Sequence, residues 1–369
     1  MTEMDMGLAP KLPRKRKRKK QSLWQSIKTG LLPVKGDSVG EIARKVVFLA
    51  ALVILVIALV FIGKHIAGYI ALEMNAAVDE NGNKTATDAH IFEVKNRAPT
   101  PQEIEQLPSG TLNEKYAALY AENKDFIGWI NIPGTNIDYP VVQTTDNDYY
   151  LHRDFDKSWL FEGTIFADYR GPITAEGMPH NTVIYGHNML YKFRFTALTN
   201  YKKNVSFLKM SPVIDFNTLY GDGKYKIFSV FLANWQKKYG DVFNYSGTAY
   251  FKNQAEFFNF VLECEDRSLY DTGVDIQYGD EFITLSTCDA STYMDLRLVV
   301  VARKVRPNED PEVDTEKIVR KKSVKYFKGY YQIYGNLWKG RTWDTSVVKG
   351  LDAYIKENGL EDEPKKKKN

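Results

Sequence analysis

The feature that most constrains this chain is an unbroken apolar segment near its N-terminus. Residues 46–62 read VVFLAALVILVIALVFI, seventeen residues without a charge or an amide. A helix needs about 17 to 25 such residues to cross the hydrocarbon core of a membrane. The segment is apolar on every face, which disfavours the buried helix of a soluble domain. We therefore predict one transmembrane helix over residues 46–69.

The residues before this segment indicate its orientation. A cleaved signal peptide is the alternative interpretation, but 45 residues precede the segment and no convincing small-residue cleavage site follows it. The run RKRKRKK at residues 14–20, with Arg44 and Lys45, places positive charge on the N-terminal side, which is typical of the cytoplasmic side. We expect a basic cytoplasmic tail over residues 1–45 and an extracellular remainder, in a single-pass protein of the cell membrane.

The charge of the chain is unevenly distributed. Residues 1–45 contain twelve basic and four acidic residues, a net charge of +8, whereas the whole chain has +4 and the other 324 residues therefore carry −4. A basic tail beside a membrane span contacts anionic lipid. Because the basic residues belong to the tail, the sequence gives little support to nucleic-acid binding by the folded part, and we expect no nucleic-acid partner.

The exported part changes character along its length. Residues 70–110 are polar and rich in turn-forming residues, which predicts an extracellular stalk with at most one short helix. Residues 112–126 have apolar side chains at helical spacing, which predicts an amphipathic helix. Short β-rich runs bounded by turns then predict strands at residues 128–143, 163–170, 181–189, 211–221, 225–234, 280–288 and 296–305. A charged, proline-flanked boundary follows, and residues 306–369 form a C-terminal extension of unknown role.

The density of strands predicts a mainly β fold, either a closed barrel or a sandwich. One amphipathic helix, predicted at residues 253–266, interrupts the strands and carries Cys264 in its apolar pattern, so Cys264 is expected to be a small buried hydrophobic residue. The chain has only two cysteines, which is no disulfide framework. A bridge between Cys264 and Cys288 would block either thiol as a nucleophile.

Three reactive side chains lie at the ends of predicted strands. Cys288 ends ITLSTC, His187 ends the run TVIYGHN, and Arg297 lies at the start of LRLVVVA, nine residues after the cysteine. A thiolate attacks amide carbonyls, an imidazole exchanges the proton, and a guanidinium donates to the oxyanion that forms. Each residue alone has an ordinary structural interpretation. Together they predict a catalytic site for acyl transfer.

Other residues stay open as alternatives for the same roles. The other candidates for the base are His90, His152 and His180, and the other arginines are Arg303 and Arg306. His90 falls in the predicted stalk and His180 in a turn, which favours surface positions, whereas His152 is harder to exclude. The sequence shows no metal-ligand spacing and no glycine-rich phosphate loop, so we expect no metal and no cofactor.

These motifs resemble those of a known family. TLSTC at residues 284–288, with an arginine nine residues on, resembles the sortase nucleophile signature, and VIYGHNM at residues 183–189 resembles the sortase histidine segment. Residues 126–155, followed by GTIFADYR, resemble class B sortases in particular. The resemblance covers about residues 111–305. It implies a closed eight-stranded sortase-type β-barrel with N-terminal helices and a helix in the connection before the cysteine strand.

The resemblance also implies an activity, a cysteine transpeptidase of Gram-positive bacteria. Such an enzyme cuts a C-terminal sorting motif in a secreted protein, holds the acyl group as a thioester, and passes it to an amine of peptidoglycan or of another pilin subunit. By position, Cys288 is the nucleophile, His187 the acid and base, and Arg297 the oxyanion or substrate clamp. The implied substrate-binding residues are Ser286, Asp289, Asn147 and Leu151.

Two other functions use the same barrel. An extracellular thiol peptidase would hydrolyse wall peptides with the same three residues and release the product to water. A non-catalytic barrel would bind wall components, and the intact trio argues against it. Class B sortases do not in general depend on calcium, so the resemblance also implies no metal.

Overall fold

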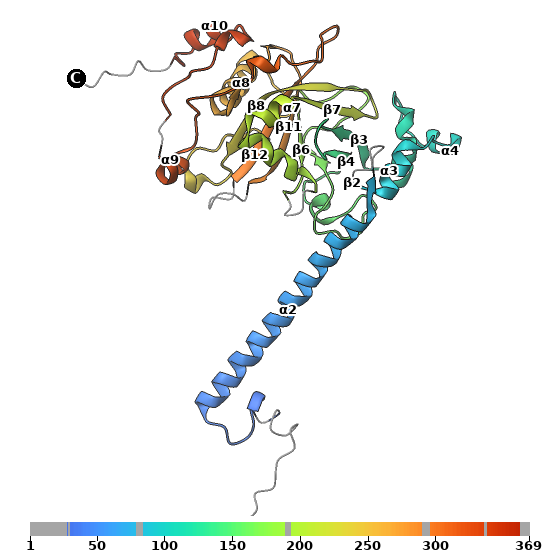
Figure 1. The fold of residues 1–369 in the computed structure, drawn as a ribbon, viewed down its shortest axis with the longest axis vertical. Helices are drawn as coiled ribbons and strands as arrows, with labels where there is room; N and C mark the ends of the chain where they lie inside the picture. The colour runs from blue at the N-terminus through green and yellow to red at the C-terminus, as the bar shows by residue number, and fades with distance from the viewer. Residues whose placement is uncertain are drawn as a thin grey trace, which may run out of the picture. The chain divides into compact units, whose positions relative to one another are not determined.

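The computed structural model describes residues 28, 30–78, 84–188, 193–289, 296–335 and 338–361. The chain forms two compact units, residues 1–67 and 68–369. Helix α2 (Val39–Asn75) contains the apolar segment, and its part Val39–Lys64 is long and apolar enough to cross a membrane (Figure 1). No residue of its most apolar window is buried. The basic run at residues 14–20 lies outside the described residues.

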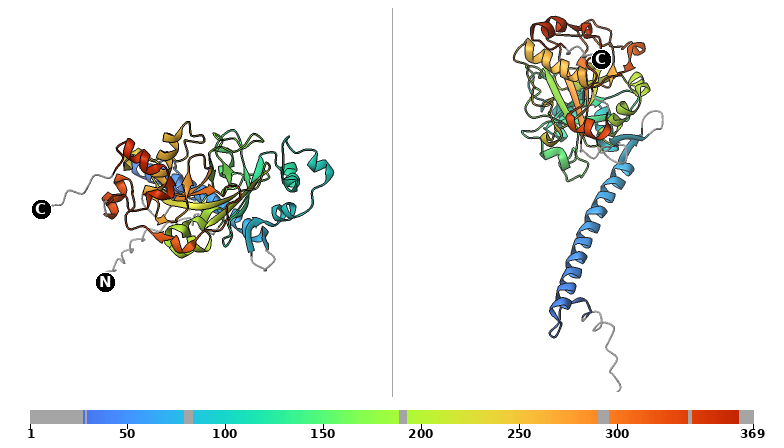
Figure 2. Two further views of the ribbon diagram at one scale, coloured as in Figure 1. Left: turned by 90° about the horizontal axis from the view of Figure 1, so that it is seen from above. Right: turned by 90° about the vertical axis from the view of Figure 1, so that its left-hand side faces the viewer.

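Eight strands of the second unit close into a barrel in the order β11-β12-β8-β7-β3-β4-β5-β6 (Figures 1 and 2). Their bounds are β3 Phe126–Asn131, β4 Asp138–Val142, β5 Phe166–Ala167, β6 Asn181–Tyr185, β7 Val213–Thr218, β8 Lys224–Ala233, β11 Phe282–Asp289 and β12 Leu296–Lys304. The prediction of a mainly β fold built as a closed eight-stranded barrel is therefore confirmed.

The sequence of strand β12 (Leu296–Lys304) illustrates why the central segments of the barrel form strands. Leu298 and Val300 point into the barrel, whereas Val299 and Val301 belong to a second cluster outside it. All four side chains have 0% exposure. A strand buried on both faces reads as a continuous apolar run instead of alternating, and branched side chains suit the pleated backbone.

Helix α8 (Gln254–Arg267) covers part of the outer face of the barrel and lies in the connection before β11. Phe257 and Val261 belong to the outer cluster together with side chains of β8 and β12, and Cys264 lies there with 0% exposure. The predicted helix and the buried state of Cys264 are both confirmed. Asn253 begins the helix by accepting a hydrogen bond from the Glu256 backbone.

The predicted helix over residues 112–126 is shorter in the structure. It consists of η1 (Glu114–Tyr116) and α5 (Ala117–Glu122), and Phe126 already belongs to β3. Asn123 ends the helix because its buried amide donates to the Tyr150 hydroxyl and to the Phe155 carbonyl, while its oxygen accepts from the Asp125 backbone. An asparagine that satisfies its side chain in this way favours a turn over continued helix.

The predicted stalk over residues 70–110 contains regular structure. Its elements are β1 Ala76–Val78, β2 Lys84–Asp88, α3 Ala89–Asn96 and α4 Pro101–Ile104. Ile91 and Val94 of α3 are buried in a cluster that includes Trp129 of β3. The folded unit therefore begins before residue 111. Only these two apolar side chains of α3 are buried, so the polar sequence around them shows no amphipathic pattern that would predict the contact.

Short elements complete the middle of the chain. They are η2 Tyr149–His152, η3 Phe195–Leu198, α6 Thr199–Lys203, α7 Val205–Met210, η4 Lys237–Tyr239, β9 Tyr270–Asp271 and β10 Ile276–Gln277.

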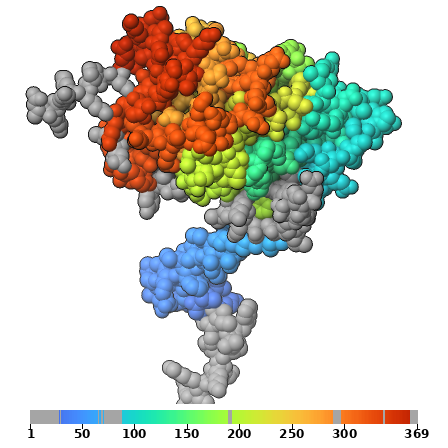
Figure 3. Space-filling model, turned by 45° about the horizontal axis from the view of Figure 1, so that its top comes forward, coloured from blue at the N-terminus to red at the C-terminus, as the bar shows by residue number. Residues whose placement is uncertain are grey.

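The C-terminal extension packs on the rest of the second unit. Its elements are η5 Thr315–Lys317, β13 Val319–Arg320, α9 Lys328–Tyr334, η6 Thr345–Val347, β14 Val348–Lys349 and α10 Leu351–Glu357. Strand β13 pairs with β9 and β14 with β10. Trp343 and Leu351 are buried in the cluster that contains α8. In Figure 3 the extension is coloured from orange to red and lies at the surface of the face in view. Residues 362–369, which hold the basic C-terminal run, lie outside the described part.

Candidate active site

The register of three neighbouring strands brings the candidate trio together. Strand β11 pairs with β12 in antiparallel register, which sets Cys288 directly opposite Arg297. On its other side β11 pairs in parallel with β6, with Ser286 opposite Tyr185. His187 follows Tyr185 by two residues, as Cys288 follows Ser286. Because parallel strands end at the same edge of a sheet, the imidazole and the thiol meet there.

A glycine permits the tight path of the chain into His187. A Cβ atom added at Gly186 would lie 2.4 Å from Cδ1 of Ile165 and 2.7 Å from Cγ of Phe195. The backbone of Gly186 donates to the Ser286 carbonyl over 3.3 Å. Any side chain at this position would collide with Ile165 and Phe195, so only glycine fits the path of the chain into His187.

Cys288 has two defined polar neighbours. Arg297 Nη1 donates a hydrogen bond to Cys288 Sγ over 2.9 Å, and the Asn188 amide donates to the Cys288 carbonyl over 2.9 Å. The thiol is partly exposed, unlike that of Cys264. The guanidinium thus places a fixed positive charge and a hydrogen-bond donor directly at the sulfur.

His187 is held in one tautomer. Its Nε2 lies 3.0 Å from the Leu151 carbonyl, which can only accept, so Nε2 carries a hydrogen and Nδ1 is the free acceptor of the neutral ring. Burial lowers the pKa of His187, and the nearby His152, Arg194 and Arg297 lower it further, against the opposing effect of the Leu151 hydrogen bond. The neutral imidazole is therefore favoured over a wider pH range than for an exposed histidine.

A pocket of about 210 Å³ opens over the thiol. Its lining residues are Asn147, Leu151, Phe166, Tyr185, Gly186, His187, Ser286, Thr287, Cys288 and Arg297. Six of the seven site residues expected from the sequence thus face one pocket. The seventh, Asp289, ends β11 opposite Leu296, and its side chain lies outside the described part of the structure. Asn147 and Leu151 reach the pocket from the loop between β4 and β5.

Sequence reasoning missed the buried carboxylate behind the pocket. Asp168 accepts hydrogen bonds from Asn147 Nδ2 over 3.1 Å and from the Tyr185 hydroxyl over 2.8 Å, and it forms an ion pair with Arg170. Burial raises the pKa of Asp168, but the hydrogen bonds from Arg170 and Tyr185 outweigh burial and hold it below its ordinary value. The motif FADYR at residues 166–170 could have indicated this carboxylate. An aspartate directly after an apolar strand is costly to bury unless it has partners, and Arg170 follows two residues later.

The alternative histidine lies behind His187. The ring of His152 stacks on that of His187, with centroids 5.8 Å apart, and its Nδ1 lies 2.9 Å from the Phe161 carbonyl. His187 is the only histidine among the described residues that line the pocket. The structure places His90 and His180 at exposed positions elsewhere.

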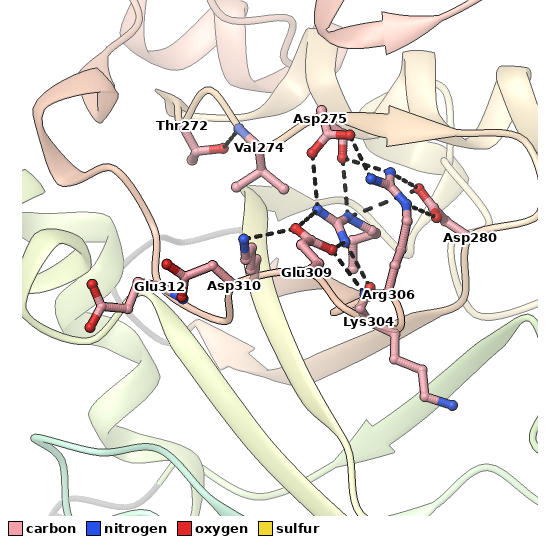
Figure 4. Close-up of polar contacts among 11 residues, drawn as sticks. Thr272, Val274, Asp275, Asp280, Lys304, Arg306, Glu309, Asp310 and Glu312 are labelled. Carbon is pink, nitrogen blue, oxygen red and sulfur yellow. Dashed lines mark hydrogen bonds and ion pairs between the residues drawn. The ribbon is translucent and has the colours of Figure 1, made fainter.

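The alternative arginines belong to a separate ion network. Arg303 has a side-chain exposure of 0% and pairs with Glu309 and Asp275. Arg306 lies between Asp275 and Asp280, at 2.6 and 2.7 Å (Figure 4). Both guanidinium groups are thus engaged by carboxylates near the other end of β12, away from Cys288. Among the described residues, no group of three or more His, Cys, Asp or Glu side chains is placed to hold a metal ion.

Comparison with known proteins agrees with this geometry. Residues 130–305 match the Sortase domain family. Sortase B of Staphylococcus aureus is 33% identical over 193 residues, which cover 52% of this chain and 75% of that protein. Sortase B of Listeria monocytogenes is 33% identical over 198 residues, covering 53% and 76%. A solved structure described as similar to sortase B, from Bacillus anthracis, is 30% identical with a TM-score of 0.50, covering 60% of this chain and 94% of that one.

A closed eight-stranded barrel with a thiol, an imidazole and a guanidinium at one edge defines a cysteine enzyme of the acyl-transfer class. The chain belongs to the sortase family, and within that family it is a class B sortase. It is therefore a cysteine transpeptidase of the sortase type.

Proposed function

We propose that this chain is a membrane-anchored transpeptidase in which Cys288 is the nucleophile, His187 the acid and base, and Arg297 the oxyanion or substrate clamp. The observation that carries the proposal is the 2.9 Å hydrogen bond from Arg297 to the Cys288 sulfur, in a pocket that His187 also lines. A thiol, a titratable ring and a fixed cation within one pocket are the groups that acyl transfer requires.

The reaction proceeds in two displacements. The Cys288 thiol passes its proton to Nδ1 of the neutral His187 ring, its sulfur attacks the scissile carbonyl carbon, and Arg297 donates to the oxygen that gains negative charge. His187 gives a proton to the departing amine, so that the C–N bond breaks and a thioester remains. An incoming amine then attacks the thioester and loses its proton to His187. The new amide departs, and His187 returns the proton to the sulfur, which restores the Cys288 thiol and the neutral ring.

The proposed substrate is a secreted protein with a C-terminal sorting motif, and the proposed acceptor is an amine of peptidoglycan or of another pilin subunit. The lining of the pocket supports a short peptide ligand. Leu151 and Phe166 offer apolar surface, while Asn147, Tyr185 and Ser286 offer polar groups at fixed positions. Helix α2 would hold the enzyme at the membrane, where exported proteins and wall precursors pass.

Peptide ligation tests this function. Full-length protein in detergent is incubated with labelled peptides that carry candidate sorting motifs, with and without a primary-amine acceptor. We expect ligation that depends on the amine. Hydrolysis alone with every acceptor would instead support a peptidase of wall peptides, and binding without any product would support the non-catalytic barrel.

The two cysteines provide a matched pair of variants. Cys288→Ala is expected to remove both the thioester and the product, a loss of at least about 10⁴-fold, because no other group replaces the nucleophile. Cys264→Ala should retain most of the activity because that thiol is fully buried behind the barrel. Product and thioester are measured by mass spectrometry. Substantial activity in Cys288→Ala would refute the assignment.

A further inference from the structure

Arg297 has an aromatic neighbour that the mechanism does not use. In the barrel, Arg297 lies between Cys288 of β11 and Ala233, the last residue of β8. Two residues past Ala233, the ring of Trp235 lies 5.5 Å from the guanidinium carbon of Arg297. A cation at this distance from an indole face is attracted by the ring. Trp235 is 51% exposed, so burial alone does not hold it there.

The turn that carries Trp235 is fixed by Asn234. This side chain is only 3% exposed, and its amide donates to the carbonyls of Gly240 and Asp241, at 3.2 and 3.4 Å. Its oxygen accepts from the Gln236 backbone at 2.8 Å. One buried residue therefore closes the segment 234–241 on itself, and the short helix η4 lies within this loop.

Helix α9 of the C-terminal extension packs directly on this turn. A Cβ atom added at Gly329 would lie 3.0 Å from both Cβ and the carbonyl oxygen of Tyr239. One added at Gly240 would lie 3.0 Å from Cβ of Lys328. Glycine on both sides lets the two backbones approach more closely than side chains would allow.

The extension also holds α9 in place. Phe327 is 6% exposed and belongs to the barrel core, and Tyr326 stacks on Tyr330 with centroids 3.9 Å apart. Lys325 binds the Glu263 carboxylate over 2.8 Å, which ties the start of α9 to α8. A continuous set of contacts therefore runs from the extension through η4 to Trp235 and Arg297.

We propose that Trp235 is a positioning residue for Arg297, and that helix α9 of the C-terminal extension braces the turn that presents it. The indole holds the guanidinium over the sulfur of Cys288, so its effect is on the step in which charge develops. This inference rests on the proposed role of Arg297 in catalysis and gives the extension a function in that site.

Substitutions of Trp235 in the full-length protein test the first part of the proposal, that Trp235 positions Arg297. Trp235→Ala and Trp235→Leu are expected to lower kcat about tenfold with little change in KM for the peptide, because they remove the ring that orients the cation. Trp235→Phe keeps an aromatic face and should restore most of kcat. Tyr278→Ala, which removes an equally exposed aromatic side chain (51%), is the matched control and should match the wild type.

Three results would overturn this half of the proposal. The first is equal activity of the Trp235→Leu and Trp235→Phe variants, and the second is no change in activity at all. The third is an increase in KM alone, which would mean that Trp235 lines the substrate site. Arg297→Ala is measured beside them. If Arg297→Ala keeps full activity, the proposed function itself fails. If Arg297→Ala is impaired but the Trp235 variants are not, only this inference fails. In the Arg297→Ala background, Trp235→Ala should cause no further loss.

Substitutions in α9 test the second half. Gly329→Ala places a methyl group against Tyr239 and should lower kcat in the same direction as Trp235→Ala, with activity expressed per titrated Cys288 thiol. Tyr330→Leu loosens α9 by removing the stack on Tyr326 and should also lower kcat. Ile333→Ala, at a position of α9 that is 52% exposed, is the control and should behave as wild type. Unchanged kcat in both Gly329→Ala and Tyr330→Leu would contradict the proposal that α9 supports the turn carrying Trp235.

Discussion

At the scale of single residues, Asp168 controls the polar side of the pocket without lining it. Its carboxylate accepts from Asn147 and Tyr185, which both face the pocket. An amide in its place offers one acceptor oxygen and adds two donors. We expect Asp168→Asn to raise KM for the peptide about tenfold while kcat changes less, because binding residues lose their orientation and the trio does not.

Steady-state kinetics at several peptide concentrations measure this split. Asp222→Asn is the control because its carboxylate is on the surface, with a side-chain exposure of 60%. A fall in kcat with unchanged KM would contradict the assignment and would place Asp168 behind the trio instead.

His187 makes a prediction about stability and pH. Burial lowers its pKa in the folded protein, so between that pKa and the unfolded value of about 6.5 the unfolded chain binds more protons. Stability must then fall as the pH drops through this window, and the contribution is constant below it. We expect the thermal midpoint of the wild type to drop more between pH 8 and pH 5 than that of His187→Gln. Equal drops would contradict the lowered pKa.

At the scale of elements, the extension is joined to α8 by a buried ion pair. Lys321 Nζ lies 2.8 Å from the Glu265 carboxylate, and the two residues are 7% and 4% exposed. Burial raises the pKa of Glu265, and Lys321 opposes that effect. Lys321→Ala leaves the carboxylate buried without its cation, so we expect a loss of about 3 to 5 kcal/mol in the free energy of unfolding.

Urea unfolding of the full chain measures this loss. Lys317→Ala, which removes a largely exposed side chain paired with Asp314, is the control and should change the free energy by less than about 0.5 kcal/mol. A loss as small as that of the control would mean that the extension is not docked through this pair.

The sequence predicted the elements with long apolar patterns and missed those held by few contacts. The strands β8, β11 and β12 and the helix α8 were predicted to within two residues, because burial on two faces or on one helical stripe leaves a strong pattern. The prediction allowed one short helix in the stalk but could not place α3, because only Ile91 and Val94 of that helix are buried. Strand β5 is two residues long, so no periodicity could bound it.

For the site, the sequence predicted which residues gather but not how they are held. Cys288, His187 and Arg297 were marked by strand ends and by motif. Register explains their meeting, since one hairpin and one parallel pair determine it. The neighbours of Asp168 and Trp235 could not be predicted, because each bridges segments whose proximity depends on closure of the barrel.

At the scale of the whole molecule, the two units make separate contributions. The residues that line the pocket all belong to the unit 68–369, and the membrane-spanning candidate begins in the unit 1–67. We expect protease added outside intact cells to digest a tag at the C-terminus and to leave a tag at the N-terminus intact, because the basic run precedes the span. Immunoblotting of both tags measures this. Digestion of the N-terminal tag alone would show the opposite orientation and contradict the prediction.

The pairing of β6 with β11 has a consequence for how the enzyme comes into being. It joins distant parts of the chain, as the hydrogen bond between Asn188 and Cys288 shows across 100 residues. Contacts between such distant segments form slowly, because a long loop must lose its freedom before the contact rewards it. Until then Cys288 is an ordinary thiol with no imidazole beside it. A chain in which β6 and β11 have not yet paired therefore lacks the assembled trio, and the recovery of activity during refolding reports on that pairing.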